Sequence, residues 1–182
     1  MATSITKLSR FLSYVLRHNP GSIGLVLDGH GWASVNDLIR LANKKGIQIN
    51  RALLERTVAE NDKKRFSFSD DEQRMRANQG HSVAVDLGLP TSIPPKLLYH
   101  GTSVHLIESI FATGLRPGNR QHVHLSNNIA TAIKVGQRHG KTVSVLEIRA
   151  YEMYLENYKF FLSVNDIWLT KHVPKDFINL KY

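Results

Sequence analysis

The chain has 182 residues, with 24 Lys or Arg against 15 Asp or Glu, and carries a formal net charge of +9 at pH 7. This length supports one large domain or two small ones, and a hydrophobic content of 42% excludes a disordered chain. The sequence contains no cysteine, which excludes disulfides, thiolate zinc sites and cysteine nucleophiles and suits a reducing cytosol.

The sequence also lacks the apolar segments of membrane and exported proteins. Its longest apolar run, residues 23–27, is far shorter than the ~20 residues that span a bilayer. Residues 1–12 show no apolar stretch followed by a small-residue cleavage site, so we expect no signal peptide. We therefore expect a soluble, cytoplasmic, basic protein without a membrane partner. Its charge attracts nucleic acids, nucleotides or phosphorylated substrates.

Residues 1–89 are predicted to form a mainly helical unit. A first helix is expected to stop at residues 19–21 and to bury a face formed by Leu8, Phe11, Leu12, Val15 and Leu16. Residues 25–33 are predicted to form a small hairpin. Further helices are expected to begin at the caps Ser34 and Asn50.

A second hairpin is predicted at the end of this unit, with strands at residues 65–69 and 74–76. The alternation of side chains along the first strand places Phe66 and Phe68 on the core face and Arg65 on the open face. Helices followed by a basic-faced hairpin favour a winged-helix-like module.

The rest of the chain is predicted to alternate short strands and helices. Residues 90–95 contain three prolines, which resist helix and central strand, and are expected to form a short, stiff linker. Beyond it, residues 96–182 form a second unit. Strands are expected at residues 97–99, 123–125, 143–148, 160–162 and 167–169, and helices at 104–112 and 129–135. The predicted fold class is α+β.

Two groups of side chains in this pattern suit anion chemistry. Arg17 and His18 end the first helix, and Arg17 lies almost opposite the apolar stripe, so we expect it outside the core. Cations in a last helical turn also commonly serve only to complement the helix dipole. Lys63, Arg65, Arg74 and Arg76 have a similar ordinary interpretation, as a solvated edge of the second hairpin.

The second group follows the first strand of the second unit. In the run Tyr99, His100, Gly101 and Thr102, the glycine lets a ligand approach the backbone between hydrogen-bonding side chains. A loop with Arg120 then leads into His122, His124 and Ser126. These histidines have no carboxylate or cysteine at ligand spacing, so we expect no metal site. Residues 138–141 are expected to form a helix cap and turn that can reach a phosphate.

Several known enzyme classes are excluded by missing motifs. Neither the phosphate-binding loop GxxxxGK[ST] nor the dinucleotide fingerprint GxGxxG is present. The nucleophile elbow GxSxG is also missing.

Taken in order, short segments of the chain resemble one family, the NAD-dependent RNA (tRNA) 2′-phosphotransferases. The match runs through most of the chain, at residues 8–20, 31–32, 63–66, 80–82, 98–102, 123–126 and 167–170. The resemblance implies an N-terminal winged-helix-like lobe that binds RNA. It also implies a C-terminal ADP-ribosyltransferase-like lobe with a mixed or antiparallel sheet that binds NAD.

The same resemblance implies the reaction and its residues. The family removes an internal 2′-phosphate from RNA with NAD as co-substrate, a reaction that belongs to tRNA splicing. Its essential set falls on Arg17, His18, Arg65 and Arg120, which we expect in a cleft between the lobes. The NAD site is expected at Tyr99, His100, Gly101, Thr102, His124 and Ser126. The expected partners are NAD and a 2′-phosphorylated, tRNA-like RNA, and the expected oligomeric state is a monomer.

Two alternatives remain open at this point. A winged-helix regulator that binds nucleic acid without catalysis explains residues 1–80 but gives no role to the segments around His100 and His124. An ADP-ribosyltransferase that uses another acceptor keeps the second lobe and changes the substrate.

Overall fold

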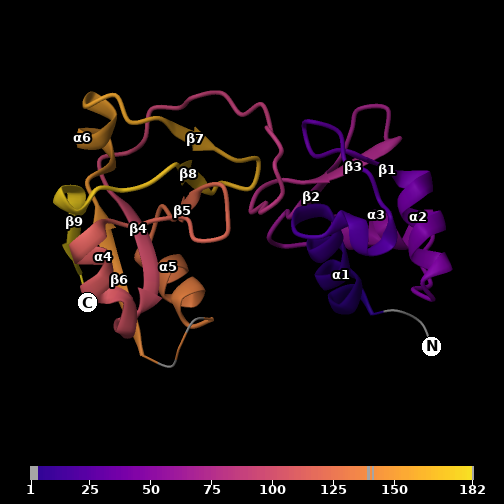
Figure 1. The fold of residues 1–182 in the computed structure, drawn as a ribbon, viewed down its shortest axis with the longest axis horizontal. Helices are drawn as coiled ribbons and strands as arrows, with labels where there is room; N and C mark the ends of the chain where they lie inside the picture. Colours follow the sequence, from indigo (N-terminus) through magenta and orange to yellow (C-terminus); the bar gives the residue numbers. More distant parts are fainter. Residues whose placement is uncertain (1–3, 139, 141, 182) are drawn as a thin grey trace. The chain divides into compact units, whose positions relative to one another are not determined.

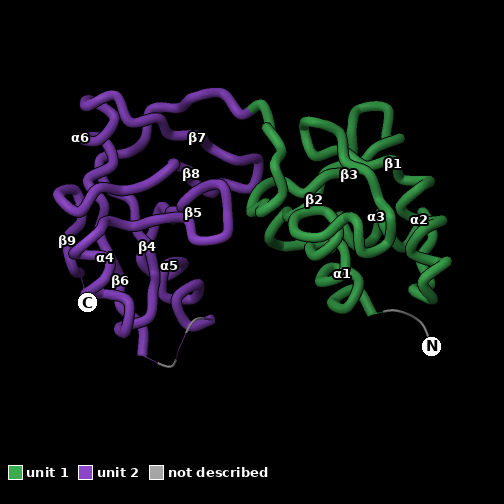
Figure 2. Tube along the Cα trace, viewed as in Figure 1, with its two compact units in different colours: residues 1–88 green, residues 89–182 purple. Residues whose placement is uncertain are grey.

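A computed structural model describes residues 4–138, 140 and 142–181. The chain divides into two compact units, Met1–Gly88 and Leu89–Tyr182 (Figure 2). Each unit has its own hydrophobic core, so each is described by itself. In the described part of the chain, no helix is both long and apolar enough to cross a membrane.

Unit 1 contains the predicted helices (Figure 1). A polar side chain caps the start of each one. These are α1 (Ile5–Arg17), α2 (Val35–Lys44) and α3 (Arg51–Ala59), with a short 3-10 helix, η1 (Pro20–Ile23), after α1. Ser34 Oγ accepts from the N–H of Asp37 at 3.2 Å, and Asn50 Oδ1 accepts from that of Leu53 at 2.8 Å. Both predicted caps are therefore confirmed.

The strands of unit 1 form one antiparallel sheet in the order β1-β3-β2. They are β1 (Ala33–Ser34), β2 (Phe66–Phe68) and β3 (Arg74–Ala77). The register pairs Phe66 with Ala77 and Phe68 with Met75, which confirms the second predicted hairpin. Phe66 is buried in the core of the unit, and Phe68 packs against that core, as the alternation predicted.

The first predicted hairpin, over residues 25–33, is wrong. Residues 25–32 form a loop that is closed by Asp28, whose Oδ1 accepts from the backbone N–H groups of His30 and Trp32, both at 2.9 Å. An aspartate that binds its own backbone in this way competes with strand pairing. Ala33 therefore pairs with Met75 of β3 and not with the residues before the loop.

Unit 2 contains two small antiparallel sheets. One has the order β4-β6-β9 and consists of β4 (Leu98–Ser103), β6 (Val143–Ile148) and β9 (Ile178–Leu180). The other has the order β5-β8-β7 and consists of β5 (Val123–Leu125), β7 (Phe160–Leu162) and β8 (Trp168–Thr170). The sequence did not predict β9. The α+β class is confirmed.

The helices of unit 2 are short. They are α4 (Ile107–Thr113), which follows the 3-10 helix η2 (Val104–Leu106), α5 (Ile129–Gly136), α6 (Ala150–Leu155) and the 3-10 helix η3 (Lys175–Phe177). Of the turn predicted over residues 138–141, His139 and Lys141 lie outside the described residues.

The proline-rich segment is not simply a linker. Thr91 forms a β-bridge with Phe161 of β7, and the N–H of Ser92 donates to the Phe160 carbonyl at 2.8 Å. These contacts fasten the segment to unit 2. Prolines cannot donate to a sheet, but the residues between them can, and the sequence did not reveal this pairing.

Helix α5 packs directly on strand β4 through two glycines. A Cβ placed on Gly101 would lie 1.8 Å from the carbonyl oxygen of Ala132, and one placed on Gly136 would lie 2.5 Å from a Val143 methyl. Gly101 was expected to make room for a ligand. In the structure, the backbone of α5 occupies the space beside Gly101. The glycine is therefore required because α5 packs closely on β4.

We predict that Gly101→Ala destabilises unit 2 by about 3 kcal/mol or more, because the clash is with backbone that cannot turn away. The measurement is urea unfolding followed by the fluorescence of Trp168, in a Trp32→Phe background that silences the only other tryptophan. Gly29→Ala is the control, since a Cβ at Gly29 meets nothing within 4 Å. Equal unfolding midpoints for the two variants would contradict this packing.

Candidate active site

The end of helix α1 is held in place by the chain that follows it. His18 caps the helix, and its N–H donates to the Tyr14 carbonyl at 3.0 Å. The next residue, Asn19, begins η1, because its side chain accepts from the N–H of Ser22 at 3.0 Å. Two helix ends therefore meet at these residues, which leaves Arg17 and His18 little freedom of backbone movement.

Arg17 lies outside the apolar core, as predicted, but it is nevertheless buried, with 9% of its surface exposed. Its guanidinium lies over the Phe66 ring, 5.8 Å from the centroid, and Nη2 donates to the Arg65 carbonyl at 3.4 Å. The helical pattern identified correctly which face of α1 packs on the apolar core. It did not show that β2 and residues 80–83 cover the other face.

Residues 80–83 are fastened to the end of α1. The N–H groups of Ser82 and Val83 both donate to the Arg17 carbonyl, at 2.9 and 3.2 Å. Gly80 has a φ of +89°, and a Cβ there would lie 3.5 Å from Arg17 Nη1. The glycine thus permits the turn that brings this segment against the guanidinium.

Ser82 contacts His18 as well. Its Oγ lies 3.0 Å from His18 Nδ1 and 3.4 Å from the Arg17 carbonyl oxygen. A hydroxyl has one hydrogen to donate. When Oγ donates it to the carbonyl, it accepts from Nδ1–H of His18, which orients the imidazole ring and places a proton on Nδ1.

His81 lies behind this pair and is neutral. It is 2% exposed, and its Nε2 is buried without a hydrogen-bond partner among the described residues. Burial lowers the pKa of His81 to about 4, with further contributions from the charges of Arg17, His18 and Arg76. At neutral pH, His81 therefore adds no charge to the cations around it.

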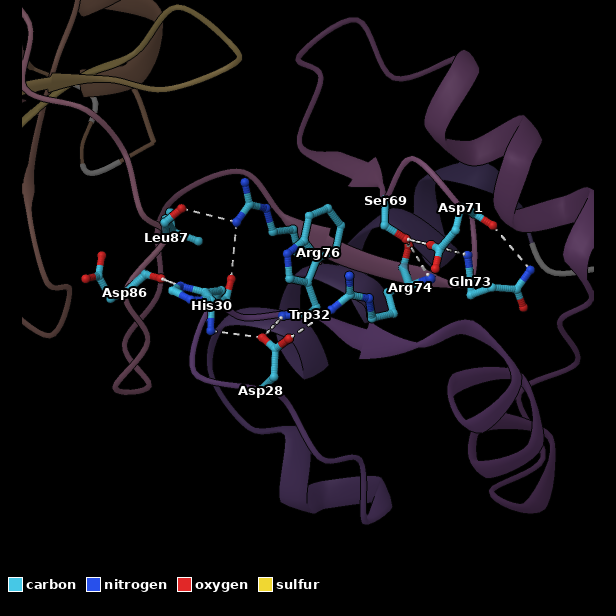
Figure 3. Close-up of polar contacts among 10 residues, drawn as sticks. All are labelled: Asp28, His30, Trp32, Ser69, Asp71, Gln73, Arg74, Arg76, Asp86 and Leu87. Carbon is cyan, nitrogen blue, oxygen red and sulfur yellow. Dashed lines mark hydrogen bonds and ion pairs between the residues drawn. The ribbon is translucent and has the colours of Figure 1, made fainter.

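A second cluster holds Asp86 and Leu87 against the loop at His30 (Figure 3). The Arg76 guanidinium lies 4.4 Å from the Trp32 ring centroid and donates to the carbonyls of His30 and Leu87, at 3.3 and 3.2 Å. Nδ1–H of His30 donates to the Asp86 carbonyl at 2.6 Å. Arg76 was expected to be solvated, and this is wrong, because it joins two loops. Desolvation lowers its pKa from the ordinary value.

Arg65 is positioned by the turn that precedes β2. Lys64 has a φ of +39°. Its N–H donates to the Asn61 carbonyl at 2.7 Å, and its carbonyl accepts from Asn78 Nδ2, also at 2.7 Å. The Arg65 Nη1 donates to Asn61 Oδ1 at 3.2 Å. Arg65 and His18 line the same groove of unit 1, of about 560 Å³. Unit 1 thus brings together Arg17, His18 and Arg65.

Arg120, the fourth predicted member, lies in unit 2. Its N–H donates to the Pro117 carbonyl at 3.2 Å, which fixes the loop before β5. Desolvation and the nearby charge of Arg138 lower the pKa of Arg120 from its ordinary value. Contact of all four residues with one ligand stays a prediction.

The residues predicted for NAD lie together in unit 2, where β4 meets β5. Tyr99 and Ser126 exchange two backbone hydrogen bonds, at 2.9 and 2.8 Å, and Nδ1–H of His100 donates to the His124 carbonyl at 2.9 Å. Thr102 and Ser126 are buried. The carbonyl contact places the proton of a neutral His100 on Nδ1, so that Nε2 is the acceptor nitrogen.

Ser82 and His81 were missed as site residues. They are separated from His18 by more than 60 residues, and their only signal in the sequence was the short segment 80–82 in the family resemblance. Within the residues that the structure describes, no group of three or more His, Cys, Asp or Glu can hold a metal ion. The cations of unit 1 instead suit a phosphate, whose oxygens bind guanidinium forks in pairs.

Comparisons with known proteins identify one family. The model of the family described as RNA 2′-phosphotransferase, Tpt1/KptA, matches residues 3–172. A probable RNA 2′-phosphotransferase of Agrobacterium fabrum is 53% identical over 175 residues, which is 96% of this chain and 94% of the relative. Proteins of the same name in Acaryochloris marina and Pseudomonas aeruginosa are 48% and 52% identical, and cover 97% and 93% of this chain. The matched regions make up 97% and 93% of the length of these two relatives.

The neutral state of His81 makes stability depend on pH in a defined window. An unfolded histidine binds a proton below a pKa of 6.5, whereas folded His81 resists protonation down to about 4. Neutral His81 therefore makes its full contribution to the free energy of unfolding above pH 6.5. As the pH falls from 6.5 to about 4, the free energy of unfolding decreases by up to about 3 kcal/mol.

Titration of the His81 ring by NMR checks this directly, and we expect no protonation between pH 7 and 5. The unfolding free energy of His81→Gln should depend less steeply on pH than that of the wild type in the same window. A His81 ring that titrates near its ordinary pKa would show that it is neither buried as described nor acted on by the neighbouring cations.

Proposed function

This chain belongs to the RNA 2′-phosphotransferase, Tpt1/KptA, family, and we propose that it removes an internal 2′-phosphate from RNA by transferring it to NAD as co-substrate. The observation that carries the proposal is the set at the end of α1, where Arg17 Nη2 donates to the Arg65 carbonyl and both His18 and Arg65 line one groove. A phosphate dianion needs positioning more than activation, and such a set supplies it.

The proposed reaction has two steps. In the first, an oxygen of the RNA 2′-phosphate attacks the anomeric carbon of the nicotinamide ribose. The bond to nicotinamide breaks, nicotinamide leaves with the electron pair, and RNA is joined to ADP-ribose through the phosphate. In the second, the neighbouring 2″-hydroxyl attacks phosphorus, and its proton ends on the RNA 2′-oxygen that leaves. The products are RNA with a free 2′-hydroxyl and ADP-ribose 1″,2″-cyclic phosphate.

The residues of unit 1 act on the phosphate. The guanidinium groups of Arg17 and Arg65 bind its oxygens and stabilise the charge that develops at phosphorus. His18, whose Nδ1–H is held by Ser82, donates from Nε2 to the phosphoryl group as an imidazolium, the form in which both ring nitrogens carry a proton. For Arg120, in unit 2, the same role stays a prediction.

The residues where β4 meets β5 fit a nucleotide. His100 and Thr102 offer hydrogen bonds to the ADP-ribose part of NAD, with Tyr99, His124 and Ser126 around it, while Gly101 keeps β4 packed on α5. Support comes from the contacts between His100 and His124 and between Tyr99 and Ser126, which bring these six positions to one place. The remaining proposals are a tRNA-like RNA as physiological partner, a role in tRNA splicing, action as a monomer and a place in the cytoplasm.

We predict that loss of the 2′-phosphate needs one NAD per phosphate and continues in EDTA, because arginine and histidine supply the positive charge. The measurement is product analysis of a 2′-phosphorylated oligoribonucleotide incubated with and without NAD, with nicotinamide and cyclic phosphate quantified. Inorganic phosphate released without NAD would identify a phosphatase instead. Duplex binding without NAD consumption would favour the non-catalytic regulator.

We also predict that Arg17→Ala, Arg17→Lys and Arg65→Ala slow the reaction by roughly 30- to 1000-fold, because each loses a paired bond to the phosphate that lysine cannot reproduce. His18→Ala and Arg65→Ala should also let the RNA–phospho–ADP-ribose intermediate accumulate. Rapid-quench product analysis measures both effects.

Arg40→Ala is the matched control, since Arg40 is an exposed arginine of the same unit that pairs only with its helix neighbour Asp37 among the contacts described. It should react at the wild-type rate. Wild-type rates in the Arg17, His18 and Arg65 variants as well would remove these residues from the mechanism.

A further inference from the structure

The groove at His18 and Arg65 continues along α1, and we infer that it binds the single-stranded RNA next to the 2′-phosphate, with the Tyr14 ring stacking on a base. The inference deepens the proposed function, because it takes the end of the groove at His18 as the place of the phosphate. The groove is formed entirely by residues of unit 1.

Helix α1 forms one wall of the groove. Thr6, Arg10, Tyr14 and His18 follow each other at intervals of four residues, so they form one row along the helix. The row is about 18 Å long at the rise of an α-helix. It therefore extends well beyond the space that one phosphate needs.

The other wall is the end of α3 and the turn before β2. Asn61 connects the walls, because its Nδ2 lies 3.5 Å from Ser9 Oγ while its Oδ1 accepts from Arg65 Nη1 at 3.2 Å. The amide side chain thus sets the width of the groove beside the arginine that is proposed to bind the phosphate.

Tyr14 is an aromatic ring held open to solvent. It is 47% exposed, although large aromatic rings are usually much more buried. Its hydroxyl accepts from Asn19 Nδ2 at 2.9 Å, and Asn19 is itself bound to the N–H of Ser22. A ring fixed in this way loses little freedom when a base stacks on it. Aromatic platforms of this kind are how proteins bind unpaired bases.

The charges along the groove favour a polyanion. Arg10, Lys63 and Arg65 line it together with His18, against Glu60 and Asp62. The Glu60 carboxylate is already paired with Arg56 at 2.6 Å. A groove with excess positive charge and a stacking ring fits a nucleic acid strand, in which backbone phosphates alternate with flat bases.

The test compares Tyr14→Ala with the wild type on two substrates. One is a 2′-phosphorylated oligoribonucleotide, and the other is the same strand with abasic residues on both sides of the phosphorylated nucleotide. Tyr14→Ala should raise KM for the first substrate roughly 5- to 150-fold, the value of one lost stacking contact. It should leave the rate on the abasic substrate and the KM for NAD unchanged.

Tyr14→Phe and Tyr14→Trp keep a ring and should stay within about threefold of the wild type. Tyr151→Ala removes an exposed tyrosine of unit 2 and should have no effect. An equal loss on both substrates would overturn the inference, because Tyr14 would then act on His18 rather than on a base. A raised KM for NAD would place the co-substrate in the groove and would overturn it as well.

Equilibrium binding of unmodified single-stranded RNA separates this inference from the proposed function. If the wild type transfers no phosphate but Tyr14→Ala still weakens RNA binding, the groove is an RNA site and the proposed reaction fails. If transfer proceeds and Tyr14→Ala binds RNA as the wild type does, the reaction stands and the inference fails.

Discussion

The two hydrogen bonds from the N–H groups of Ser82 and Val83 to the carbonyl of Arg17 are the contact on which the candidate site depends. The last carbonyls of an α-helix have no partner within the helix. Here the backbone N–H groups of residues 82 and 83, distant in sequence, bind the last carbonyl of α1. The same segment buries the Arg17 guanidinium beside Phe66 and brings the Ser82 hydroxyl to His18. Arg76, which lies over the Trp32 ring, in turn joins the loop at His30 to Leu87, a few residues after this segment.

This arrangement gathers cationic side chains around Arg17 without adding the charge of a further histidine. His81 is packed against the cations but stays neutral, because burial and the charges of its neighbours oppose its protonation. A charged histidine there would repel Arg17. In unit 2, the backbone pairing of Tyr99 with Ser126 and the contact of His100 with the His124 carbonyl bring polar side chains of β4 and β5 together. In both units, backbone contacts between distant segments position the side chains.

Local patterns predicted the local structure well. The apolar spacing of α1, the caps at Ser34 and Asn50 and the hairpin around Met75 all depend on neighbours a few residues apart, and the structure confirms them. The failures depend on distant contacts. The hairpin at residues 25–33 is replaced by the Asp28 turn and by pairing with β3, and Arg17 is covered by a segment that a helical wheel does not include. Ser82 and the groove along α1 were beyond prediction for the same reason. The resemblance to a family named the candidate residues, but it did not show what holds them.

We propose that the end of α1, held by residues 80–83, binds the 2′-phosphate. The most direct measurement is the affinity for an oligoribonucleotide with one internal 2′-phosphate, compared in the absence of NAD with the same strand carrying a 2′-hydroxyl. The wild type should prefer the phosphorylated strand by about tenfold or more, as one charge-assisted hydrogen bond to a phosphate implies. Arg17→Ala should lose this preference while binding the 2′-hydroxyl strand normally. Equal affinity of the wild type for both strands, or an undiminished preference in Arg17→Ala, would contradict the account.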